Sequence, residues 1–117
     1  MSTVLQEFAE EFGRCWICGS RGDWRPLQIH HICRGPNREK TLNERCTLIR
    51  CCANCHEDKL DSMSVVRQVA IKMLFDPEWY NRVAVNRFRG RADDAISEQD
   101  IAVEISFLIA QPVDLII

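Results

Sequence analysis

Two cysteine pairs constrain the fold of this 117-residue chain more than any other feature of its sequence. Cys15 and Cys18 form one C-x2-C unit, Cys52 and Cys55 form another, and 33 residues separate the two units. A C-x2-C turn presents two sulfur atoms to one ion, and four thiolates at about 2.3 Å satisfy the tetrahedral geometry of zinc. The spacing therefore predicts a structural zinc site. The spacer exceeds the roughly 15–20 residues of a simple zinc ribbon, so it must fold into a unit of its own.

The other three cysteines, Cys33, Cys46 and Cys51, have no such spacing and are expected to be core or surface thiols. Two alternatives to the four-cysteine site stay open. In the first alternative, the cysteine pairs are buried thiols that bind no metal. In the other, Cys51 replaces Cys52, because a spacing of three residues is also within the usual range.

Length and composition are those of an ordinary globular protein of one domain, with 46% hydrophobic and 27% charged residues. No apolar run approaches the roughly 20 residues of a membrane span. The segment 1–14 carries acidic residues where a secretory signal has basic ones. We therefore expect a cytoplasmic protein that makes no membrane contact, and in a reducing compartment seven cysteines favour metal binding over disulfides.

Charge is unevenly distributed along the chain. The net charge of −2 disfavours a nucleic-acid partner. Residues 12–60, however, hold nine Lys and Arg residues against five acidic ones. The basic side chains are therefore concentrated where the cysteines and histidines are.

Periodicity predicts a helix over residues 3–12 and a strand over residues 27–30 that follows Pro26. The polar residues 33–45 are expected to form a loop, and residues 46–50 a second strand. From Ala53 onward the sequence favours a helix.

The C-terminal part is expected to be helical. An apolar face predicts a helix that begins after Ser62 or Ser64 and packs on the core; this face consists of Val65, Val66, Val69, Ala70, Met73 and Leu74. A second helix is expected to begin with Asp76 as its N-cap and to end near Gly90.

The last helix is predicted to begin at Ser97. Ser97 and Asp100 approximate a capping box before the apolar run 101–110. Gln111 and Pro112 are expected to end this helix.

All three histidines of the chain lie between the cysteine pairs or beside them. His30 and His31 are neighbours at the end of the first predicted strand, and His56 directly follows Cys55. A zinc ion at the cysteines fixes the start of the helix that carries His56, and the loop 33–45 folds the second strand back beside the first. We therefore expect the three imidazoles to converge, although a lone histidine is more often a structural residue.

This order of C-x2-C, apolar-His-His-apolar, loop, strand and C-x2-C-His resembles the HNH endonucleases over residues 15 to about 60. The resemblance implies an α+β fold with a ββα-metal, treble-clef-like core at residues 13–62, stapled by the four-cysteine zinc. A helix precedes that core, and residues 63–117 form a helical extension within one domain of 1–117. The extension resembles helices appended to phage-type HNH proteins.

The resemblance also implies roles for individual residues. His30 and His56 bind the catalytic divalent ion, which is Mg²⁺, Mn²⁺ or another divalent ion, and His31 is the general base. The family's middle Asn aligns with Thr47, so this chain departs from the family at that position. Thr47, or Asn43 in the loop, is then expected to brace the site by hydrogen bonding.

Arginine and lysine side chains near the histidines are candidate DNA phosphate contacts: Arg34, Arg38, Lys40 and Arg45. A solvated loop is the alternative for these four residues. A second basic cluster, Arg82, Arg87, Arg89 and Arg91, either extends a DNA track or forms a polar helix face, and the second interpretation is favoured.

Two functions therefore compete. The first is a metal-dependent HNH endonuclease or nickase that hydrolyses DNA phosphodiester bonds, associated with a phage or prophage. The second is a zinc-stabilised module with weak catalysis that binds nucleic acid or a phage packaging protein. The presence of all three histidines favours the enzyme, because a pure binding module has no need of His31.

Overall fold

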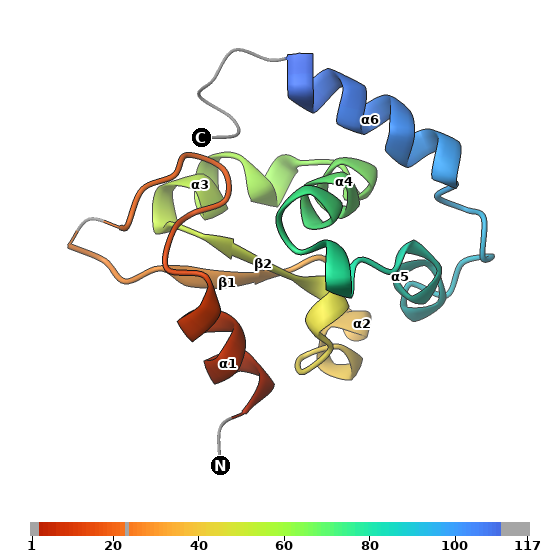
Figure 1. Cartoon of the computed structure of the whole chain (residues 1–117). Coiled ribbons are helices and arrows are strands. Elements are labelled where there is room, and N and C mark those ends of the chain that lie inside the picture. Colours follow the sequence, from red (N-terminus) through yellow and green to blue (C-terminus); the bar gives the residue numbers. More distant parts are fainter. Residues whose placement is uncertain (1–2, 23, 111–117) are drawn as a thin grey trace.

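A two-stranded antiparallel sheet lies at the centre of the protein. The computed structural model describes residues 3–22 and 24–110. In the sheet, Ile29 pairs with Arg50 and His30 pairs with Ile49. The helix that follows the second strand packs back against the first strand. The elements of this central part are α1 (Val4–Glu11), β1 (Gln28–His31), β2 (Leu48–Cys51) and α3 (Ala53–Asp58). The predicted α+β class is confirmed in this form (Figure 1).

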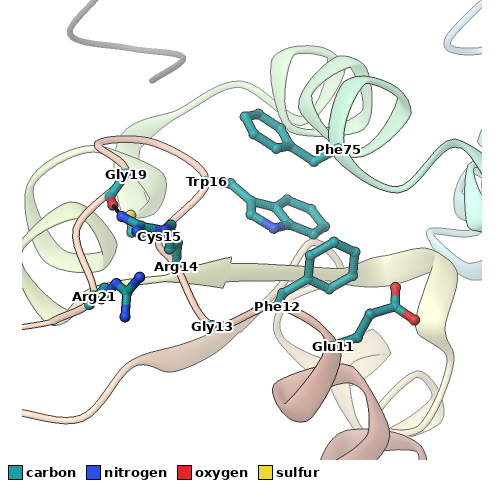
Figure 2. Close-up of a pocket in the computed structure, with 9 residues that line it drawn as sticks. All are labelled: Glu11, Phe12, Gly13, Arg14, Cys15, Trp16, Gly19, Arg21 and Phe75. Carbon is teal, nitrogen blue, oxygen red and sulfur yellow. Dashed lines mark hydrogen bonds between the residues drawn. The ribbon is translucent and has the colours of Figure 1, made fainter.

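Helix α1 anchors the N-terminal segment through an aromatic cluster. Thr3 and Gln6 form a capping box at its start, and Phe8 is fully buried. Trp16, in the first cysteine turn, stacks on Phe75 with ring centroids 5.3 Å apart and meets Phe12 edge to face (Figure 2). These rings border a cavity of about 500 Å³, which no histidine lines.

The prediction of a loop over residues 33–45 was wrong in part. Residues Pro36–Lys40 form a short helix, α2, which begins after Gly35 with φ of 62°. Proline at the first helical position removes an amide that has no partner there, and the residues that follow it tolerate helical geometry. A 3-10 turn, Arg45–Thr47, then occupies the start of the predicted second strand, so β2 begins at Leu48.

Helix α4 (Val65–Phe75) begins at Ser64, whose hydroxyl accepts a hydrogen bond from the Arg67 amide. It follows a 3-10 turn at Leu60–Ser62. Its buried side differs from the predicted apolar face, because Gln68, Ile71 and Lys72 are buried while Met73 is exposed. Polar groups enter this buried side because they have specific partners on the sheet and on the neighbouring turn.

Asp76 does not cap a helix that runs to Gly90, as the sequence suggested. Its carboxylate accepts hydrogen bonds from Lys72 and Arg45, so the chain after it forms only a 3-10 turn, Pro77–Trp79. The next helix, α5 (Arg82–Phe88), has its own N-cap in Asn81.

Buried Lys72 ties α4 to the sheet. Its Nζ donates to the Leu48 carbonyl and to Asp76, both at 2.9 Å, and lies 4.8 Å from the centre of the Phe8 ring. Burial lowers the pKa of Lys72, and the Asp76 carboxylate opposes that effect. This cation therefore stabilises the junction of α1, α4 and β2.

Helix α6 (Glu98–Ala110) packs on α4. The predicted capping box is confirmed, since Ser97 and Asp100 each accept a hydrogen bond from the other's amide. The predicted stop at residues 111–112 lies outside the described residues. No helix in the described part of the chain is long and apolar enough to cross a membrane.

Candidate functional site

Four cysteine sulfurs from two separate turns converge at one point. The sulfurs of Cys15, Cys18, Cys52 and Cys55 all lie within 4.8 Å of one another, and those of Cys18 and Cys52 are 3.8 Å apart. A tetrahedron with zinc–sulfur bonds of about 2.3 Å has edges of about 3.8 Å. The cluster therefore has the dimensions of a structural zinc site.

Backbone amides support this cluster. The amides of Ile17 and Cys55 donate to the sulfurs of Cys15 and Cys52, each at 3.4 Å. Such hydrogen bonds favour the thiolate form that a metal requires. Burial raises the pKa of Cys15, so a zinc ion must displace a proton there.

The remaining cysteines stand apart from the cluster. Cys51 is buried and directs its sulfur to the Gln28 carbonyl at 3.7 Å, so the cluster contains Cys52 and not Cys51. Burial raises the pKa of Cys46 to about 11 and that of Cys51 to about 12. Both are unreactive thiols at neutral pH.

The second site is formed by β1, α3 and the turn that follows α3. One ligand atom from each of His30, His56 and Asp61 lies within 4.8 Å of the others. The His30 and His56 rings meet at 74° with centroids 5.1 Å apart. The three side chains border a cavity of about 330 Å³, lined by Ile29, His30, His31, Arg34, Gly35, Arg38, His56 and Asp61.

Gln68 determines which nitrogen of His30 is free. The Gln68 amide nitrogen donates to the carbonyls of Met63 at 2.9 Å and Leu60 at 3.4 Å, so its oxygen must face His30. That oxygen lies 2.7 Å from His30 Nε2, which therefore carries the proton. Nδ1 is left as the ligand atom. Burial lowers the pKa of His30 to about 4, so the ring is neutral at pH 7.

Gln28 holds His56 in a similar way. Its side-chain oxygen lies 2.7 Å from His56 Nδ1, while His56 Nε2 lies 3.7 Å from an Asp61 carboxylate oxygen. A glutamine oxygen accepts from Nδ1–H and leaves Nε2 for a cation. Two imidazoles and one carboxylate suit divalent ions such as Mn²⁺, Zn²⁺ or Mg²⁺, so the donor set fits the expected ion.

His31 has a different environment from its neighbour. Its Nε2 donates to the Leu42 carbonyl at 3.2 Å, because a carbonyl only accepts. Nδ1 therefore holds the free lone pair. Burial lowers the pKa of His31, so the ring is neutral at pH 7 and able to accept a proton.

Thr47 braces the loop that holds His31. Its buried hydroxyl lies 2.8 Å from the Glu44 carbonyl and 3.3 Å from the Thr41 carbonyl, on either side of Leu42. No hydrogen bond joins Thr47 to a histidine within the described residues. Asn43 is exposed in the same loop.

The four predicted phosphate contacts separate into two groups. Arg34 and Arg38 line the histidine cavity, and Arg34 donates to the Asp61 carbonyl at 2.8 Å. Lys40 is exposed at the end of α2 but is not among the lining residues. Arg45 lies elsewhere, in ion pairs with Glu11 and Asp76, and does not line the histidine cavity.

Sequence reasoning missed Asp61 and Gln68. Asp61 follows α3 in a 3-10 turn, and three acidic residues after His56 gave no basis for choosing it: Glu57, Asp58 and Asp61. Gln68 was hidden in an apolar pattern. The sequence signal that would have identified Gln68 is a single glutamine on the otherwise apolar, core-facing side of a helix.

Comparisons with protein-family models, with curated proteins and with solved structures found no match to this chain. The function of the chain is therefore inferred from the geometry of the two sites.

Proposed function

We propose that this chain is a divalent-metal-dependent DNA endonuclease or nickase of the HNH type. In this proposal β1, β2 and α3 are the ββα-metal core, and zinc at the four cysteines staples it in a treble-clef-like arrangement. His30, His56 and Asp61 hold the catalytic ion.

One observation carries the proposal: neighbouring residues of β1 present two free nitrogens with different surroundings. His30 belongs to the His–His–Asp cluster, whereas the proton on His31 Nε2 is held by a backbone carbonyl. The two side chains leave the strand in different directions but border the same cavity, so one imidazole can hold the ion while the other acts on a nearby water. A purely structural pair does not need a free Nδ1 beside a cationic cavity.

The reaction that fits is hydrolysis of a phosphodiester. His31 Nδ1 accepts a proton from water as the water oxygen attacks phosphorus. The bond from phosphorus to the 3′ oxygen breaks, and the leaving 3′ oxygen takes up a proton from solvent water. The divalent ion supplies stabilisation for the negative charge on the phosphate and the leaving oxygen. The guanidinium groups of Arg34 and Arg38 position the phosphate.

The test is a plasmid assay with zinc-loaded protein. Supercoiled DNA is incubated without added metal, with Mg²⁺ and with Mn²⁺, and nicked and linear products are quantified. We expect metal-dependent cleavage, which His31→Ala lowers by about 10²- to 10⁴-fold while zinc content is unchanged. His30→Ala should recover part of its activity at higher metal concentration. Cleavage by His31→Ala at the wild-type rate would refute the assignment of the base.

The alternative function, a zinc-stabilised binding module, predicts DNA binding with no cleavage in any of these metals. Association with a phage and docking to a packaging protein rest on the sequence resemblance alone. DNA is the partner that the cavity and its arginines support.

A further inference from the structure

The four arginines around α5 are not equivalent in the fold. Arg87 forms two hydrogen bonds of 2.8 Å with the Asp93 carboxylate. Arg82 is paired with Asp94 at 3.2 Å and Glu98 at 3.0 Å. The charges of Arg82 and Arg87 are therefore neutralised within the protein.

Arg89 and Arg91 have no such partners. Neither forms an ion pair within the described part of the chain. Both border a hollow of about 270 Å³, lined by Ile32, Arg34, Asn37, Val65, Arg89 and Arg91, and none of these residues is acidic. Arg34 has the Asp61 carboxylate at 3.9 Å as a partner, so the guanidinium groups of Arg89 and Arg91 are the ones that an anion entering the hollow would stabilise.

Arg34 connects this hollow with the candidate catalytic site. It lines the hollow beside Arg89 and Arg91, and it also lines the histidine cavity beside Arg38. The turn at the end of α5 brings the two arginines there: Gly90 has φ of 71°, and the Arg91 amide donates to the Asn86 carbonyl at 2.8 Å. A continuous arginine path, defined as Arg38, Arg34, Arg89 and Arg91, results.

We propose that the arginine path binds the phosphodiester backbone of DNA next to the phosphate that is cleaved. This inference rests on the proposed function and extends it, because it assigns Arg89 and Arg91 to substrate binding and leaves Arg82 and Arg87 to the fold. The guanidinium fork matches a phosphate with two parallel hydrogen bonds. Backbone contacts of this kind give affinity and register without reading the base sequence.

A DNA backbone explains the path better than an acidic protein does. Two hollows that share one arginine suit a polyanion with regularly repeated charges, and one of them contains the proposed hydrolytic site. An acidic partner protein does not explain why the arginine path continues into the cavity that His31 lines.

The experiment measures binding, so it does not depend on catalysis. The parent protein is zinc-loaded His31→Ala without added divalent ion, and its affinity for a short labelled duplex is measured by fluorescence anisotropy between about 50 and 200 mM salt. Arg89→Ala and Arg91→Ala are compared with Arg87→Ala, which removes the same charge from the same region. Zinc content and circular dichroism confirm folding, and the exposed Arg91 tests the idea if Arg89→Ala is unstable.

Each path variant should reduce the slope of log K against log salt by about 1, and should weaken binding roughly eightfold at 0.1 M salt. Arg87→Ala should leave the slope unchanged. Equal slopes for Arg91→Ala and Arg87→Ala would overturn the path while leaving the nuclease proposal intact, since the plasmid assay tests the latter separately. A parent that binds no DNA would overturn both.

Discussion

Gln68 provides the sharpest test of how the proposed metal ligands are held. Gln68→Met keeps the length of the side chain but removes both the oxygen that faces His30 and the nitrogen that faces Leu60 and Met63. Because Nε2 of His30 loses its acceptor, nothing then fixes the ring with Nδ1 free. We expect weaker binding of the divalent ion and a less stable fold.

The size of both effects follows from burial. Gln68 is 1% exposed and His30 is 2% exposed, so water cannot replace the lost partners. A buried donor or acceptor without a partner costs about 1–3 kcal/mol, and the change leaves at least two, on His30 and Met63. We expect the free energy of unfolding to fall by about 2–6 kcal/mol. Loss of a hydrogen bond behind a metal ligand typically lowers metal affinity by about 10- to 100-fold.

Calorimetric titration with Mn²⁺ and urea unfolding measure the two quantities. Gln99→Met is the matched control, because it makes the same chemical change at an exposed position on α6. Zinc content should be the same in all three proteins, since the four cysteines are untouched. Wild-type Mn²⁺ affinity in a folded Gln68→Met protein would show that Gln68 does not orient the ligand.

Three further changes test the zinc, the third metal ligand and the loop. Cys52→Ser should abolish zinc binding and unfold the core, because zinc binding in such modules contributes of the order of 10 kcal/mol to folding. Elemental analysis measures the bound zinc and circular dichroism measures the folding. The control variant Cys46→Ser should keep its zinc. Asp61→Asn should weaken Mn²⁺ binding by about tenfold or more, whereas exposed Asp58→Asn should not, and equal titrations of the two would remove Asp61 from the site. Thr47→Val should lower stability by about 1–2 kcal/mol and reduce turnover at an unchanged metal midpoint; a shifted midpoint would contradict a role through His31 alone.

The central elements could be predicted because short-range patterns specify them. Alternation around Ile29 marks a strand, and two C-x2-C turns bring distant segments together. The helix expected from Asp76 to Gly90 failed for a tertiary reason. The Asp76 carboxylate forms ion pairs with Lys72 and Arg45 instead of capping a helix. No local sequence pattern shows that these two residues lie beside it.

The candidate site could be predicted only as far as its histidines. Their grouping follows from their place between the cysteine pairs or directly after the second pair, as the cluster of His30, His56 and Asp61 illustrates. The groups that orient them come from elsewhere: Gln68 is 38 residues from His30, and the Leu42 acceptor is a backbone atom that carries no sequence signal. Second-layer partners depend on packing and therefore become visible only in the structure.

The separate supports of His30 and His31 explain why two imidazoles stand side by side. His30 is held from α4 through Gln68, whereas His31 is held from the loop that Thr47 braces. A perturbation of α4 should therefore alter metal affinity, and a perturbation of the loop should alter proton transfer at unchanged metal affinity. If Gln68→Met and Thr47→Val instead gave the same defect, the two histidines would act as one unit. The division between ligand and base would then have to be abandoned.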